Sequence, residues 1–199
     1  MFMRKPDVMS LSSGSVPEGA FISQYSTTHG GYSDCYYVDI QKDVALSDYI
    51  LAFFNTPIFR MERLILNLVP SGRSNEQCVL GLAFGTGDKM AGWKTEKRDE
   101  NQLLLAVGDG PIRTFLMVQG KQSSETTPTK TTRLYFGSAV LPTSMTKDGH
   151  PKLAIVFKLF SGLHIFYSRL LLWWAARDLG RKSRSSHSLT EEDKNVRPN

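Results

Sequence analysis

A long apolar run near the C-terminus constrains this chain most: LFSGLHIFYSRLLLWWAARDLGRK, at residues 159–182. The wider segment 153–176 is long enough for a bilayer span, which needs about 20 predominantly apolar residues. It also contains Lys158, His164 and Arg169, and each of these is costly in hydrocarbon unless it faces protein or water. Helical periodicity places Lys158 and Arg169 on one narrow polar side. We therefore expect a helix that a curved sheet covers around most of its circumference.

We expect this helix at about residues 151–179. Its wide apolar remainder would contain Phe157, Phe160, Leu163, Phe166, Leu170, Leu171 and Trp174. A spanning or membrane-surface helix is the alternative, because the basic tail RDLGRKSRSSHS suits an anionic membrane as well as a helix C-terminus. Trp173 and Trp174 suit a protein core and an interfacial belt equally.

Composition indicates one globular domain. The chain has 199 residues, of which 41% are hydrophobic and 22% are charged. Two cysteines make no disulfide framework, and the N-terminus lacks a secretory apolar stretch, so we expect a cytoplasmic protein. The net charge of +5 lies largely in the tail and accompanies no nucleic-acid-binding motif, which makes a nucleic-acid partner unlikely. We divide the chain into a flexible N-terminal arm at 1–31, a domain at 32–179, and a disordered basic and polar tail at 180–199.

The domain begins with a strand and two short helices. SDCYYVDI, at 33–40, alternates as a strand does, and Ser47 is a candidate cap for a helix that ends before Asn55. Thr56 followed by Pro57 predicts the start of a second helix that runs to about Val69. The inward positions of this second helix are expected to be Ile58, Met61, Ile65 and Leu68.

The second half is expected to be a β meander followed by the long helix. QCVLGLAF at 77–84 suits a strand, and the glycine-rich, polar residues 85–101 suit a loop without a phosphate-binding pattern. Strands follow at 101–107, 112–119 and 132–141. Alternation places Arg113, Phe115 and Met117 opposite Thr114, Leu116 and Val118, and it places Arg133, Tyr135 and Gly137 opposite Leu134, Phe136 and Ser138. Periodicity alone does not say which face is the interior.

This order of elements resembles the α+β helix-grip fold of the START-like superfamily, in which a curved antiparallel sheet wraps a long C-terminal helix. More closely, the chain is similar to an uncharacterised bacterial family, the domain of unknown function 2867. The matching stretches are YSDCYYVDI, DYILAFFNTPIFRMERLI, ENQLLLAVGDGPIRTFL and FKLFSGLHIFYSRLLLWWA. The resemblance implies a cavity between sheet and helix and a habit of binding apolar small molecules, with no catalytic activity to carry over.

Four residues are candidates for polar contacts in such a cavity. His164 can act as a base or a ligand contact near neutral pH, although a lone histidine on an apolar helix is more often a hydrogen-bonded core residue. Arg113 and Arg133 can hold a carboxylate or can be solvated rim charges. Tyr135 can orient a ligand through its hydroxyl or simply pack in the core.

These residues lead to three hypotheses of different classes. The first is a non-catalytic binder of a hydrophobic small molecule, without a cofactor. The second is a lyase, cyclase or hydrolase that uses His164 as a general base. The third is a membrane-peripheral module that uses the C-terminal helix and tail. No histidine pair has metal-ligand spacing, and no serine or cysteine lies in a nucleophile motif, so we expect neither a metal site nor a catalytic constellation.

Overall fold

A computed structural model describes residues 12–27, 32–66, 75–121, 130–141, 144–145, 151–152 and 164–181. The strands are β1 (Ser12–Ser13), β2 (Tyr32–Ile40), β3 (Lys89–Met90), β4 (Trp93–Arg98), β5 (Gln102–Val107), β6 (Ile112–Lys121), β7 (Thr131–Val140), β8 (Ser144–Met145) and β9 (Pro151–Lys152). The helices are α1 (Ser23–Thr27), α2 (Leu46–Phe54), α3 (Pro57–Leu66), α4 (Glu76–Phe84) and a C-terminal helix at 164–181.

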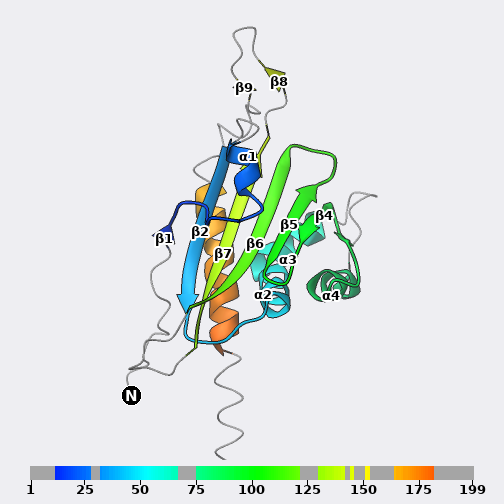
Figure 1. Cartoon of the computed structure of the whole chain (residues 1–199). Helices are drawn as coiled ribbons and strands as arrows, with labels where there is room; N and C mark the ends of the chain where they lie inside the picture. The colour runs from blue at the N-terminus through cyan, green and yellow to red at the C-terminus, as the bar shows by residue number, and fades with distance from the viewer. Residues whose placement is uncertain are drawn as a thin grey trace, which may run out of the picture.

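The protein is an α+β fold built on one curved antiparallel sheet (Figure 1). Its seven strands lie in the order β1-β2-β7-β6-β5-β4-β3, and β8 pairs separately with β9. After β2 the chain passes through α2, α3 and α4 to the far edge, and a meander from β3 to β7 then returns to pair with β2. This return places the first long strand beside the last strand of the meander.

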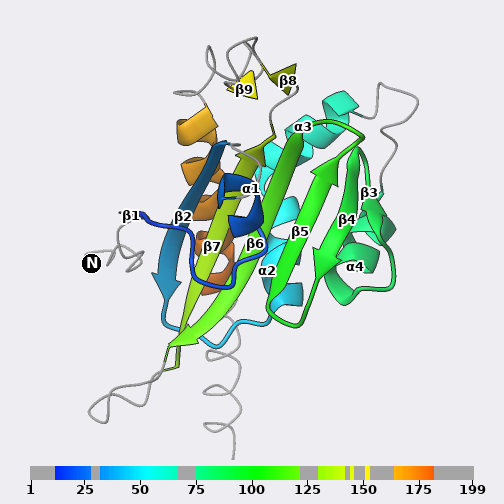
Figure 2. The same ribbon diagram turned by 45° about the horizontal axis from the view of Figure 1, so that its top comes forward.

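Helices cover one face of the sheet. Figure 2 shows α2, α3 and the C-terminal helix on the side opposite α1. The main core lies on that side, because Val38, Leu116, Leu134 and Phe136 meet buried residues of α2 and of the C-terminal helix there. The alternating side chains of the central strands therefore point to two faces that are both covered, and neither face is simply exposed to solvent.

The N-terminal segment covers the other face. Ala20, Ile22 and Tyr25 are buried against Phe115, Met117 and Tyr135 of the sheet. Gly137 permits this contact, because a Cβ there would lie 2.7 Å from the Asp34 carbonyl oxygen and 3.3 Å from Ile22 Cδ1. We expected residues 1–31 to form a flexible arm, but residues 12–27 pack against the domain. The sequence did not predict this packing, because the few apolar residues of 12–27 lie among serines and glycines.

The helix pair begins as predicted at its proline but differs in detail. Thr56 Oγ1 accepts a hydrogen bond from the Phe59 N–H at 3.3 Å, and α3 starts at Pro57. The Ser47 prediction is wrong, because α2 begins after Ala45 without a side-chain cap. Met61 was expected to point inward but is 62% exposed, and Phe59 is buried instead. The predicted end at Val69 lies outside the described residues.

Residues 77–84 form most of helix α4 rather than a strand. Asn75 Oδ1 accepts a hydrogen bond from the Cys78 N–H at 3.0 Å, and Gly85, with a φ of 71°, ends the helix in the left-handed conformation. Arg98 donates from Nη2 to the Ala83 carbonyl at 2.7 Å and so satisfies a helix-end acceptor. The expected loop 85–101 contains β3 and β4, because polar side chains suit a strand near the sheet edge.

The C-terminal helix is covered on one face only. Leu171, Leu172, Ala175, Ala176 and Leu179 are buried, whereas Phe166 is 64% exposed. The expectation that the sheet wraps most of the circumference is therefore wrong on the Phe166 side. The predicted start at 151 is also wrong, because 151–152 belong to β9. Residues 153–163, Lys158 included, and the tail beyond 181 lie outside the described residues. Within the part of the chain that is described, no helix has the length and apolarity to cross a membrane.

Candidate functional site

A pocket of about 280 Å³ lies between the helix-facing side of the sheet and the C-terminal helix. Strands β4 to β7 supply its floor, and α2, α3 and the C-terminal helix supply its walls. Thirteen described residues line it: Phe53, Phe59, Gly92, Trp93, Val107, Ile112, Thr114, Phe136, Ser138, Val140, His164, Tyr167 and Leu171. None of these residues carries a carboxylate, an ammonium or a guanidinium group. The pocket is thus largely apolar, with a few hydrogen-bonding groups.

Aromatic rings form one continuous wall of the pocket. The centroids of Phe53 and Phe136 are 4.9 Å apart, those of Phe53 and Phe59 6.1 Å, and those of Phe59 and Trp93 5.1 Å. These tilted contacts are favourable beyond the burial of area, and they hold the rings in fixed positions. Trp93 Nε1 donates to Thr114 Oγ1 at 3.4 Å across the sheet. The wall therefore presents rigid ring surfaces to whatever enters.

A hydrogen-bonded network joins the pocket to the sheet at Ser138 and His164. Ser138 Oγ lies 2.7 Å from His164 Nε2 and 2.7 Å from Asp34 Oδ1, and the Ser138 N–H also donates to Asp34 Oδ1 at 3.0 Å. Asp34 Oδ2 lies 3.5 Å from the same His164 nitrogen. Ser168 Oγ, one helical turn after His164, lies 3.5 Å from that nitrogen as well. Strand β2 thus contributes Asp34, strand β7 contributes Ser138, and the C-terminal helix contributes His164 and Ser168.

The protons in this network follow from the single hydrogen of the Ser138 hydroxyl. A carboxylate is only an acceptor, so the 2.7 Å contact with Asp34 requires Ser138 Oγ to be the donor. Ser138 Oγ must then accept from His164, which places a proton on Nε2. A serine nucleophile activated by histidine needs the opposite direction of this bond. The arrangement therefore holds the imidazole in place and does not activate Ser138.

Asp34 is ionised in this setting. Burial raises the pKa of its carboxyl group, but hydrogen bonds from His164 and Ser138 outweigh burial and bring the pKa below its ordinary value. Tyr36, whose hydroxyl donates to Asp34 Oδ2 at 3.4 Å, has a raised pKa because of burial and the nearby Asp34 charge. The Asp34 carboxylate thus lies behind the hydrogen-bonding groups of Ser138 and His164 on one side of the pocket.

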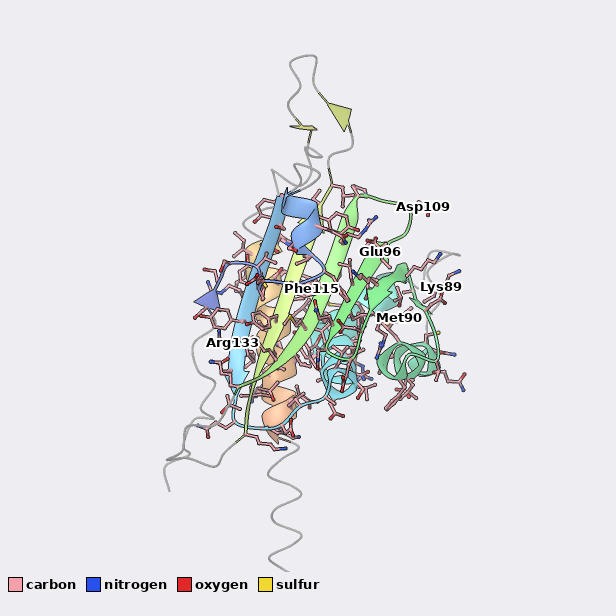
Figure 3. All side chains as sticks on the ribbon, in the orientation of Figure 1. Lys89, Met90, Glu96, Asp109, Phe115 and Arg133 are labelled. Atoms are coloured by element: carbon pink, nitrogen blue, oxygen red, sulfur yellow. The ribbon has the colours of Figure 1, made fainter. Side chains whose placement is uncertain are left out.

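Of the four predicted site residues, His164 lines this pocket. Arg113, Arg133 and Tyr135 lie on the other face of the sheet and do not line it. Figure 3 labels Arg133 near β2 and Glu96, the partner of Arg113, toward the β4 side. The structure therefore separates the predicted set into one pocket residue and three residues behind the sheet.

Arg133 is held by an ion pair on that face. Its Nε and Nη2 donate to the two carboxylate oxygens of Asp39 at 2.6 and 2.9 Å, and its guanidinium lies 4.0 Å from the Tyr37 ring centroid. Lys121 Nζ also contacts Asp39. The hydrogen bonds from Arg133, together with Lys121 and against the effect of burial, lower the pKa of Asp39. The guanidinium is thus committed to a structural carboxylate.

Arg113 and Tyr135 have protein partners as well. Arg113 pairs with Glu96, which also accepts a hydrogen bond from the Tyr25 hydroxyl, so this contact fastens the N-terminal segment. The Tyr135 hydroxyl donates to Gln119 Oε1 at 2.8 Å. Arg113 and Tyr135 therefore stabilise the fold on this face of the sheet through an ion pair and a hydrogen bond.

Sequence reasoning missed Asp34, Ser138, Trp93 and Thr114. The available signal was the strand alternation, which puts Ser138 on the same face as Phe136 and Leu134. Alternation alone does not indicate a site here. The site becomes evident only when β2 is known to pair with β7, because this pairing places Asp34 opposite Ser138.

The described residues give little support to a thiol nucleophile or to a metal site. Burial and the Asp34 charge raise the pKa of the Cys35 thiol to about 12, so this thiol stays protonated at neutral pH. No group of three or more His, Cys, Asp or Glu side chains gathers in a metal-binding arrangement within the described ranges.

A second depression, of about 510 Å³, lies between α2, α4 and the C-terminal helix. Its lining includes the exposed side chains of Leu80 and Glu76, so this depression is open to water where the pocket at His164 is lined mainly by buried or partly buried side chains. We therefore take the pocket at His164 as the candidate site. Comparison of the chain with protein families, with curated proteins and with solved structures finds no match.

Proposed function

We propose that the pocket at His164 binds a small, uncharged and largely apolar molecule that carries one hydrogen-bonding group. The observation that carries this proposal is the lining: an aromatic wall, no charged side chain among the described lining residues, and a hydrogen-bonded network at Ser138 and His164. Burial against the rings provides affinity, and the polar groups fix orientation. A charged ligand would lose its hydration, and no Lys, Arg, Asp or Glu side chain among the described lining residues would pair with it.

The architecture supports the same proposal. A curved antiparallel sheet, a C-terminal helix across one face and a pocket between them are the features of a helix-grip domain of the START-like superfamily. We extend the proposal to that fold and to the family called the domain of unknown function 2867. Strand pairing in crystals of the protein, compared with that of a helix-grip domain, tests this assignment.

The binding proposal is tested with the uncharged fluorescent probe N-phenyl-1-naphthylamine. The blocking variant is Val107→Trp, because Val107 lines the pocket and is only partly buried. The matched control is Ala106→Trp, the neighbouring residue on β5, whose side chain points to the other face.

We expect the native chain and Ala106→Trp to bind one probe with a gain in fluorescence, and Val107→Trp to bind at least about ten-fold more weakly, since a lost apolar contact of about 1.4 kcal/mol gives this factor. The proposal is overturned if the native protein gives no gain or if both variants bind alike. Native mass spectrometry of the purified chain then identifies any molecule that it retains.

A proton-transfer enzyme is a second candidate, favoured by the position of His164 at the pocket wall with ionised Asp34 behind it. Here His164 would be a general acid or base toward a bound substrate. His164→Gln keeps the size and hydrogen-bonding ability of the side chain but not its basicity. If a substrate identified by mass spectrometry were turned over at the native rate by this variant, the enzyme hypothesis would be rejected and the binding proposal would stand.

A further inference from the structure

The C-terminal helix carries an outward surface that neither the core nor the pocket uses. We call it the outer face and define it as Ile165, Phe166, Arg169, Leu170, Trp173 and Arg177. These positions recur every three to four residues, so they form one stripe along the helix. Phe166 is 64% exposed and Ile165 38% exposed, and five of the six residues line a shallow groove. A large apolar stripe in contact with water is uncommon on a protein that works alone.

The charge of the outer face has one sign. Arg169 is exposed, and the Arg177 guanidinium lies 5.1 Å from the Trp173 ring centroid and 5.3 Å from that of Trp174. The one acidic residue in 164–181 is Asp178, which lines the depression beside α2 and α4 instead. Arg181 ends the helix, and the sequence continues with Lys182 and Arg184. The stripe thus combines apolar side chains with two arginines, Arg169 near its middle and Arg177 at its C-terminal end.

We propose that the outer face docks on a membrane surface that contains anionic lipids. Phe166, Ile165 and Trp173 enter the boundary between headgroups and acyl chains, where aromatic side chains are favoured. Arg169 and Arg177 remain at the level of the headgroups and contact phosphate and carboxylate oxygens. The helix lies flat on the membrane, because its opposite face stays buried against the sheet.

A second copy of the chain fits the outer face less well. In a two-fold contact the same patch meets itself, so the arginines of one copy would face the arginines of the other. Like charges in such a contact are unfavourable unless carboxylates separate them, and the outer face contains none. Charge complementarity therefore favours an anionic lipid surface.

The test uses full-length protein in a flotation assay with vesicles of phosphatidylcholine alone or mixed with phosphatidylserine. The apolar variant is Phe166→Ser, and its matched control is Phe84→Ser, a phenylalanine at the end of α4 that is 62% exposed. The charge variant is Arg169→Gln, and its control is Lys94→Gln on β4, which is also exposed.

We expect the native protein to bind the mixed vesicles, and to bind them less tightly as salt is added. Phe166→Ser should weaken this binding about ten-fold or more, and Arg169→Gln about five-fold, whereas both controls should bind like the native chain. The proposal is overturned if the native protein ignores the mixed vesicles or binds neutral vesicles equally well. It is also overturned if the controls lose as much binding as the test variants, or if sedimentation shows a dimer that Phe166→Ser abolishes.

Discussion

Ser138 on β7 and His164 on the C-terminal helix are joined by a 2.7 Å contact between Oγ and Nε2, which ties the helix to the sheet beside the pocket. Ser138 also satisfies the buried Asp34 carboxylate, so its hydroxyl acts as both donor and acceptor. The helix is therefore positioned by a directional polar contact in addition to its apolar face.

Ser138→Ala tests this contact. The variant leaves Asp34 Oδ1 with the backbone N–H alone and removes the nearest acceptor of His164 Nε2–H, so we expect the free energy of unfolding to fall by about 1 to 3 kcal/mol. A double-mutant cycle with His164→Phe, measured by urea unfolding, should show a coupling of about 0.5 kcal/mol or more. A cycle of Ser138→Ala with the distant Asn75→Ala should be additive. If the cycle with His164 is additive too, the two side chains do not interact.

The stability of the protein should fall in acid through Asp34. The folded-state pKa of Asp34 lies below its ordinary value of 3.8, so ionisation stabilises the fold above that pH, and this contribution is lost as the pH falls through the folded pKa. Asp34→Asn should lower the free energy of unfolding near neutral pH, and its difference from the native protein should shrink in acid. Urea unfolding from about pH 7 to about pH 3 measures this trend. The pKa of Asp39 is also lowered in the folded protein, so Asp39 stabilises the fold in the same way. The stability of Asp34→Asn should therefore still fall in acid, but less steeply than that of the native protein.

Arg133 should matter for stability and not for ligand binding. Arg133→Met removes two hydrogen bonds to the buried Asp39 carboxylate, which keeps Lys121 as a partner, so we expect a loss of about 1 to 3 kcal/mol. The affinity for N-phenyl-1-naphthylamine should equal that of the native chain, because Arg133 lies behind the sheet from the pocket. If Arg133→Met is folded by circular dichroism but binds the probe more weakly, Arg133 contributes to ligand binding after all.

Strand alternation and proline position were reliable parts of the sequence analysis. Alternation predicted β2 and the central strands, and Thr56 with Pro57 predicted the start of α3. These signals are local, since side chains alternate along any strand and a proline at the first helical position loses no hydrogen bond.

The site was harder to predict because its residues are distant in sequence. Asp34 and Ser138 are 104 residues apart and meet only because β2 pairs with β7. The arginines were assigned to a cavity because alternation cannot say which face of a sheet holds the pocket when both faces are covered. Residues 12–27 cover the second face of the sheet. The sequence did not predict this packing, because Ile22 and Tyr25 are among few apolar residues in a polar segment.

Helix caps explain the wrong prediction for residues 77–84, and two variants test this explanation. Asn75→Ala removes the acceptor of the Cys78 N–H, so the protein should lose about 1 kcal/mol of stability. Ser47→Ala should change stability by less than about 0.5 kcal/mol, because Ser47 is inside α2 and does not cap it. Thermal unfolding of the two variants distinguishes the caps, and a larger loss in Ser47→Ala would contradict the helix start at Leu46.

Gly137 should be the least replaceable glycine in the sheet. A Cβ at this position would lie 2.7 Å from the Asp34 carbonyl oxygen, which is backbone of the paired strand, so Gly137→Ala must move β2 away from β7 and also crowds Ile22. We expect a loss of about 1 to 3 kcal/mol, as for overpacking in a core. Gly120→Ala on β6 is the matched control, since nothing lies within 4 Å of its added Cβ, and it should leave stability unchanged or slightly higher. Urea unfolding compares the pair, and equal stability of the two variants would contradict the close approach of the β2 backbone to Gly137.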